Sequence, residues 1–114
     1  MPGFNYTPSP AYLTQTAVTF ATSGSNTLVT GVTGQIVRIY RMYLTAATST
    51  TLTFNDGSTA VSGAMNLAAN GQINMDYMGG EPLYTCSKGN SFTATNLSPV
   101  QISGTIWSTI LNPP

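Results

Sequence analysis

The chain has 114 residues, three cationic and three acidic side chains, no histidine and a formal net charge of zero. This length fits one domain that folds around its own core without covalent or metal staples. Only 5% of the residues are charged, far below the roughly 25% of an ordinary soluble domain. Three cations cannot neutralise a run of phosphates, so neither nucleic acid nor an anionic membrane surface is expected as a partner. The low charge also removes the electrostatic repulsion that keeps copies of a small domain apart, which favours a protein that belongs to an assembly.

Cysteine content and the N-terminal residues bear on compartment and cofactors. Cys86 is the only cysteine, so no intramolecular disulfide is possible and no metal site is indicated. No apolar run is long enough to span a bilayer, and the first residues lack the basic start and apolar centre of a signal peptide. We therefore expect no metal, no cofactor and no export by the general secretory route.

Residues 1–13 are predicted to form an extended N-terminal arm. Three prolines and a glycine within this span exclude a helix and any central strand. Aromatic residues punctuate the arm, although a merely solvated tail usually lacks them; they are Phe4, Tyr6 and Tyr12. An arm of this composition either docks on a partner through these aromatics, or folds back on its own domain, or is disordered.

The next segments alternate in the manner of short strands. Thr14 to Phe20 has the pattern of a half-buried strand, with Thr16 and Val18 on the face of Phe20. A turn is predicted at residues 23–26, a short strand at 27–30, and a glycine-bracketed turn at 31–34.

Residues 35–44 lie within the longest segment without Gly, Pro, Ser or Asn, and are predicted to be the central strand. Strict alternation gives two faces that are mainly apolar and carry one arginine each: Val37, Ile39, Arg41 and Tyr43 on one, and Ile36, Arg38, Tyr40, Met42 and Leu44 on the other. A small sandwich has one core, so the second face needs another cover, most simply a second copy of the chain. The candidate subunit contacts here are Arg38, Tyr40, Arg41 and Tyr43; the alternative is an ordinary exposed sheet face.

Short strands and tight turns continue through the second half of the chain. Strands are predicted at 50–55, 59–67, 73–77, 83–86 and 92–97. Asp56-Gly57 and Asn70-Gly71 are predicted hairpin turns with glycine at positive φ, and Gly63 is expected to mark a bulge or a close backbone approach.

Trp107 falls on the outward face of the last predicted strand, among threonines. A large aromatic side chain in that place calls for a partner that covers it, which makes Trp107 a further candidate for a subunit interface. The alternative is a bulge at Gly104 that returns Trp107 to the core.

Eight or nine short strands with regular turn signals predict an all-β fold, an antiparallel β-sandwich of jelly-roll type. The expected boundaries are an extended N-terminal arm at 1–13, the sandwich domain at 14–111 and a C-terminal tail at 112–114. Without histidine, the usual catalytic triads and imidazole metal sites are impossible. The only acids are Asp56, Asp76 and Glu81, at or near predicted turns, so a paired-carboxylate site is not expected either. We predict a protein that is not an enzyme.

The run from Gly34 to Gly71 resembles small virion proteins of tailed bacteriophages, of the capsid decoration (cement) or head-fibre kind. The most specific part is Ser62-Gly63-Ala64-Met65 followed by Leu67-Ala68-Ala69. The resemblance covers about half of the chain and fades after Asp76.

This resemblance implies a structural virion protein, made in the host cytoplasm and placed on the capsid exterior. A homotrimer would sit at a threefold or quasi-threefold position and clamp neighbouring copies of the major capsid protein, with Phe4, Tyr6 and Tyr12 as the capsid-binding arm. The leading alternative is a head-fibre or tail-tip module that binds a host-surface glycan, for which Trp107, Gln101 and Asp76 are the candidate residues. A stand-alone cellular structural protein is a third possibility.

Overall fold

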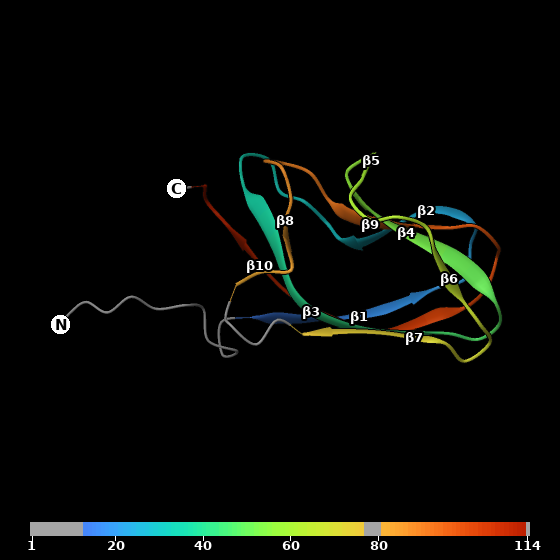
Figure 1. The fold of residues 1–114 in the computed structure, drawn as a ribbon. Coiled ribbons are helices and arrows are strands. Elements are labelled where there is room, and N and C mark those ends of the chain that lie inside the picture. Colours follow the sequence, from blue (N-terminus) through green and yellow to red (C-terminus); the bar gives the residue numbers. More distant parts are fainter. Residues whose placement is uncertain (1–12, 77–80, 114) are drawn as a thin grey trace.

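In the computed structural model, which describes residues 13–76 and 81–113, the chain is a sandwich of two antiparallel β-sheets (Figure 1). Sheet A has the strand order β1 (Thr14–Phe20), β10 (Ile102–Leu111), β3 (Ile36–Ala46) and β7 (Gln72–Asp76), and β8 (Tyr84–Thr85) also pairs with β3. Sheet B has the order β2 (Gly24–Val29), β9 (Phe92–Asn96), β4 (Thr50–Asp56) and β5 (Thr59–Ala60), and β6 (Met65–Leu67) also pairs with β4. No helix occurs among the described residues. The predicted antiparallel β-sandwich is confirmed, whereas the jelly-roll type and the arm stay predictions.

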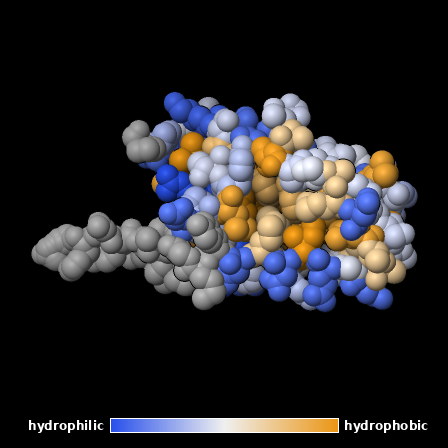
Figure 2. Space-filling view, viewed as in Figure 1, coloured by the Kyte–Doolittle hydropathy of each residue, from blue (hydrophilic) through white to orange (hydrophobic). Residues whose placement is uncertain are grey.

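Apolar side chains that alternate along the strands fill the space between the sheets. Leu44, Ile102 and Ile106 of sheet A face Leu52 of sheet B, and all four are completely buried. The rings of Phe54 and Phe92, on neighbouring strands of sheet B, stack with centroids 5.4 Å apart. Figure 2 shows hydrophobic surface in the middle of one side of the molecule, at the level between the sheets, with hydrophilic residues along its lower edge. The core is therefore a single layer between two sheets.

The prediction that the central strand has two apolar faces with one arginine each is wrong, because β3 contains a bulge. Trp107 of β10 pairs with Arg41, but the next residue, Ser108, pairs with Ile39, so Tyr40 is an extra residue without a partner on β10. The bulge shifts the alternation by one residue. Val37 and Ile39 before it, and Met42, Leu44 and Ala46 after it, all belong to the same core cluster.

Two strand boundaries differ from the prediction. β2 begins at Gly24 rather than at residue 27, because the side chains of Thr22 and Asn26 bond to one another and close the turn before it. The strand predicted at 59–67 is split into β5 and β6. Between them the backbone N–H groups of Val61 and Ser62 both donate to the carbonyl oxygen of Phe54, which forms a bulge one to two residues before the predicted position at Gly63.

The two glycine-containing turns have different outcomes. Gly57 has φ +63° and lies first in the two-residue connection between the paired residues Asp56 and Thr59, so this hairpin is confirmed. Asn70-Gly71 is not a hairpin, because it connects β6 of sheet B with β7 of sheet A. Asn70, not Gly71, has the positive φ of +62°, a conformation that asparagine tolerates.

Some predicted features lie outside the described residues. They are the aromatic residues of the arm, Phe4, Tyr6 and Tyr12, together with Tyr77 at the end of a predicted strand. No helix in the described part of the chain is long and apolar enough to cross a membrane.

Candidate functional site

The outer face of sheet A, which points away from sheet B, carries most of the predicted interface residues. Antiparallel pairing arranges its side chains in three rows across β1, β10, β3 and β7: Gln15, Trp107, Arg41, Asp76; then Ala17, Thr105, Tyr43, Asn74; then Thr19, Ser103, Thr45, Gln72. The aromatic and charged residues gather in the first two rows. The third row is uncharged and consists of hydroxyl and amide side chains.

The bulge at Tyr40 brings both arginines to this face. Arg38 lies between the core residues Val37 and Ile39, and Arg41 lies beside the core residue Met42, so each points away from the core. Sequence alternation had placed them on opposite faces. Two of the three cationic side chains of the chain thus share one surface.

Arg41 is the centre of the first row. Its Nε lies 3.6 Å from Oδ1 of Asp76 on β7, and its guanidinium carbon lies 5.4 Å from the centre of the Trp107 ring on β10. The side chains of Arg41 and Asp76 are 36% and 43% exposed. An exposed ion pair contributes roughly 0 to 1 kcal/mol and an exposed cation–π contact about 0.5 to 1 kcal/mol, so these contacts order the face more than they stabilise the fold.

The structure decides between the two positions considered for Trp107. The core residue Ile106 is completely buried, and Trp107 points to the opposite side, where it contacts Arg41. Gly104 stays in register with Leu44, and the bulge lies on β3 instead. Trp107 is therefore an outer-face residue, half-buried in the single chain.

Tyr40, Tyr43 and Arg38 differ in exposure. Tyr43 is 39% exposed between Thr105 and Asn74. Tyr40, the bulged residue, is only 5% exposed and lies outside the core cluster. Nε of Arg38 and Oγ1 of Thr109, directly opposite one another, are buried and have no hydrogen-bond partner within residues 13–76 and 81–113.

The outer face of sheet B differs in character. Threonine and asparagine side chains cover it, and Asn55 Nδ2 donates to the hydroxyls of Thr93 and Thr95 at 3.2 and 3.0 Å. Asn55 and Thr93 are buried within this network. Because these polar groups bond to each other, this face offers fewer free groups to a partner than the outer face of sheet A.

The residues considered for glycan binding come together only in part. Asp76 and Trp107 flank Arg41 in the same row. Gln101 precedes β10 at its other end, about 20 Å from Trp107 at the usual rise of a strand, and its amide donates to Thr19 and Ser103. The guanidinium of Arg41 also lies over the Trp107 ring, where a sugar would stack.

Sequence analysis missed the role of Asp56, which it treated only as a turn residue. This carboxylate is 5% exposed and accepts hydrogen bonds from Tyr84 Oη at 2.9 Å, Ser87 N at 2.9 Å, Ser87 Oγ at 3.2 Å and Asn90 Nδ2 at 2.9 Å. Burial raises the pKa of Asp56, but the bonds from Asn90, Ser87 and Tyr84 outweigh it and lower the pKa below its ordinary value. A buried carboxylate saturated with donors holds the loops together. An acid directly before a hairpin glycine gave no sign of these partners.

Among the described residues, potential metal ligands lie apart from one another and the one thiol is buried. The described part of the chain contains no group of three or more His, Cys, Asp or Glu side chains that could hold a metal ion. Cys86 is buried, and burial, with the charge of Asp56, raises the pKa of its thiol to about 12, which leaves it protonated and unreactive at neutral pH.

Comparison of the chain with protein-family models, with curated proteins and with solved structures finds no match. A functional proposal therefore rests on the residues of this chain and on their geometry.

Proposed function

We propose that this chain is a structural virion protein that decorates an icosahedral phage capsid and stabilises it by clamping neighbouring capsid subunits. The observation that supports a binding role is the outer face of sheet A. There the bulge at Tyr40 gathers Arg38, Arg41, Tyr43 and Trp107 on one surface. Arginine, tyrosine and tryptophan are the residues most enriched at the energetic centres of protein interfaces.

We assign this face to contacts between copies of the chain in a homotrimer. Its mixture of a cation, an acid and exposed aromatic surface suits a contact that is partly polar. The outer face of sheet B, whose amides and hydroxyls bond to one another, would then face solvent or the capsid.

The strand order supports the assignment to the jelly-roll type. β1 to β4 alternate between the sheets, and the pairing is nested: β1 with β10, β2 with β9, β3 with β7, and β4 with β5. Jelly rolls of two sheets recur in viral capsid and lectin domains. The segment that resembles phage decoration proteins, residues 34–71, includes β3 to β6 and contributes strands to both sheets. The β-sandwich agrees with the fold that this resemblance implies. A shared fold alone does not establish function.

Decoration would stabilise the shell through mass action. Only the assembled lattice places neighbouring capsid subunits side by side, so a protein that binds across them favours the assembled state. The low charge of the chain predicts that such binding depends little on salt. A glycan-binding role finds less support, because Gln101 lies far from Trp107 and Arg41 covers the ring.

The proposal is tested by co-sedimentation with empty shells assembled from the major capsid protein encoded in the same genome. We expect the full chain to pellet with shells but not with unassembled capsid subunits, to the same extent in low and high salt. A chain that begins at Leu13 should fold but fail to pellet, because it lacks the aromatic anchors of the arm. Equal binding by the truncated chain would move the attachment surface to the sandwich, and no binding by the full chain would contradict decoration itself.

A further inference from the structure

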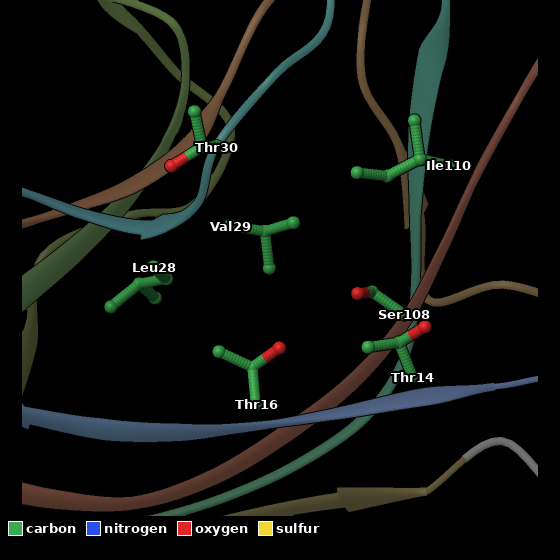
Figure 3. Close-up of a pocket in the computed structure, with 7 residues that line it drawn as sticks. All are labelled: Thr14, Thr16, Leu28, Val29, Thr30, Ser108 and Ile110. Carbon is green, nitrogen blue, oxygen red and sulfur yellow. The ribbon is translucent and has the colours of Figure 1, made fainter.

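A cavity of about 370 Å³ opens between the two sheets on the side where β1 and β2 are the edge strands. Figure 3 shows the residues around it, which come from both sheets: Thr14, Thr16, Leu28, Val29, Thr30, Ser108 and Ile110. This volume is at the lower end of the roughly 300 to 1,000 Å³ of ligand pockets, and it can take one large side chain.

The lining of the cavity is half polar and half aliphatic. Hydroxyl groups come from three threonines and Ser108, and aliphatic surface comes from Leu28, Val29 and Ile110. Leu28 and Val29 are each 6% exposed, whereas Ile110 is 40% exposed. A side chain that combines an apolar ring with one hydroxyl group, as tyrosine does, matches this lining.

The register of β1 and β10 indicates which residue reaches the cavity. Thr14 pairs with Ser108 and Thr16 with Ile106, so two more residues in the same register would place Tyr12 opposite Ile110. β10 continues as a strand to Leu111 through its pairing with β3, and can therefore accept this extension. Alternation puts residue 12 on the same face as Thr14 and Thr16, which is the face that lines the cavity.

We propose that Tyr12 extends β1 and that its ring fills the cavity between the sheets, against Ile110 and Val29 of the same chain. Pro10 has no N–H group and ends the extension. Tyr12 then belongs to the sandwich, and the arm that is free to bind a partner is shorter, with Phe4 and Tyr6 as its aromatic residues. This inference concerns folding within one chain and does not depend on capsid decoration.

Disulfide trapping in the full chain tests the proposed register. Residues directly opposite in an antiparallel pair have Cα atoms about 4.5 to 5.5 Å apart, within the range that a disulfide bridges. Mild oxidation of Tyr12→Cys/Ile110→Cys should therefore link residues 12 and 110 within one chain in most molecules. The matched control, Ala11→Cys/Ile110→Cys, should yield only traces, because residue 11 would point to the opposite face. Native Cys86 is buried and should not interfere.

Peptide mapping without reduction distinguishes the outcomes. A link between residues 12 and 110 that exceeds the control supports the proposal. An equal yield from both pairs, or no link, overturns it. A link between two chains also overturns it, and would show that the cavity takes the arm of a second copy.

Thermal unfolding gives a second measurement that needs no oxidation. Tyr12→Ala should lower Tm by about 5 °C or more, because the cavity loses the ring that packs in it, whereas Tyr6→Ala should leave Tm unchanged. In an Ile110→Ala background, the effect of Tyr12→Ala should shrink, because the contact is already weakened. If Tyr12→Ala and Tyr6→Ala have the same Tm, Tyr12 does not occupy the cavity. Neither measurement involves capsids, so failure here leaves the decoration proposal to its own test.

Discussion

Asp56 shows how a single residue connects the two sheets. It ends β4 of sheet B, and its carboxylate bonds to Tyr84 in β8 of sheet A and to Ser87 and Asn90 in the loop before β9. The charge is buried, but four donors satisfy it. A buried carboxylate of this kind stabilises the fold only while all its partners are present.

Asp56→Ala is expected to lower the free energy of unfolding by about 2 to 3 kcal/mol, because it removes four hydrogen bonds to a buried charged group, whose donors on Tyr84, Ser87 and Asn90 are partly buried or exposed. Asp76→Ala is the matched control. Its carboxylate is 43% exposed and, among residues 13–76 and 81–113, its one side-chain partner is Arg41, so we expect a change below about 1 kcal/mol. Urea unfolding measures both values. Equal losses for the two variants would contradict the structural role assigned to Asp56.

The Asp56 network also predicts a pH dependence. The donors hold the folded-state pKa of Asp56 below its ordinary value of 3.8. A lowered folded-state pKa contributes stability above the unfolded-state pKa, and this contribution is lost as the pH falls through the folded-state value. The urea concentration at which half of the native chain is unfolded should therefore decrease as the pH is lowered below about 4. In Asp56→Ala, this acid-induced decrease should be smaller; an identical decrease would assign it to other groups.

At the scale of an element, the bulge in β3 has the largest effect on the surface. An extra residue in one strand reverses the direction of every following side chain relative to simple alternation. Without it, Met42, Leu44 and Ala46 would point away from the core that Val37 and Ile39 enter. The same residue that keeps β3 in the core throughout its length also brings Arg38 and Arg41 to one face.

The close pairing of β10 with β3 depends on Gly104. A Cβ atom at this position would collide with the carbonyl oxygen of Tyr43 in the neighbouring strand. Gly104→Ala must therefore separate two central strands, and we expect a loss of about 3 kcal/mol or more in the free energy of unfolding. Gly63→Ala is the control, because its Cβ would meet no atom within 4 Å. Denaturant unfolding should show a clear difference; similar stabilities would mean that the strands separate at little cost.

At the scale of the whole molecule, the two outer faces of the sandwich differ. One presents arginines and aromatic residues, and the other presents threonine and asparagine side chains that bond to each other. A protein with so little charge has weak electrostatic protection against association. This asymmetry is the basis for assigning self-association to the outer face of sheet A.

Sedimentation equilibrium tests that assignment. The native chain should sediment as a trimer, at three times the chain mass of 11.9 kDa. Tyr43 is 39% exposed in the single chain, so Tyr43→Glu should leave the fold intact but shift the equilibrium toward monomer, because an unpaired charge would be buried in the interface. Thr95→Glu, on the outer face of sheet B, should have no effect on mass. A native chain that sediments at the monomer mass contradicts the proposed trimer, and an equal effect of both variants contradicts the choice of face.

The amino-acid sequence by itself determined the features that depend on local backbone preferences. Alternation predicted β1 with the bounds observed and placed Ile106 inward and Trp107 outward on β10. The Asp56-Gly57 pair predicted a hairpin with glycine at positive φ. These features follow from the two-residue period of a strand and from the freedom of glycine, both of which are present in the sequence itself.

Only the tertiary structure decided the features that depend on distant residues. The bulge at Tyr40 exists because Ser108, which follows Tyr40 by 68 residues, pairs with Ile39 and not with Tyr40. The partners of Asp56 lie 28 to 34 residues away, and the cavity beside Thr14 requires both sheets. A short window of sequence contains neither the register between such segments nor the packing of one sheet on the other, because both arise from contacts between residues far apart in the chain. For this reason the sequence could single out Arg38, Arg41, Tyr43 and Trp107, but it could not show that they gather on one face.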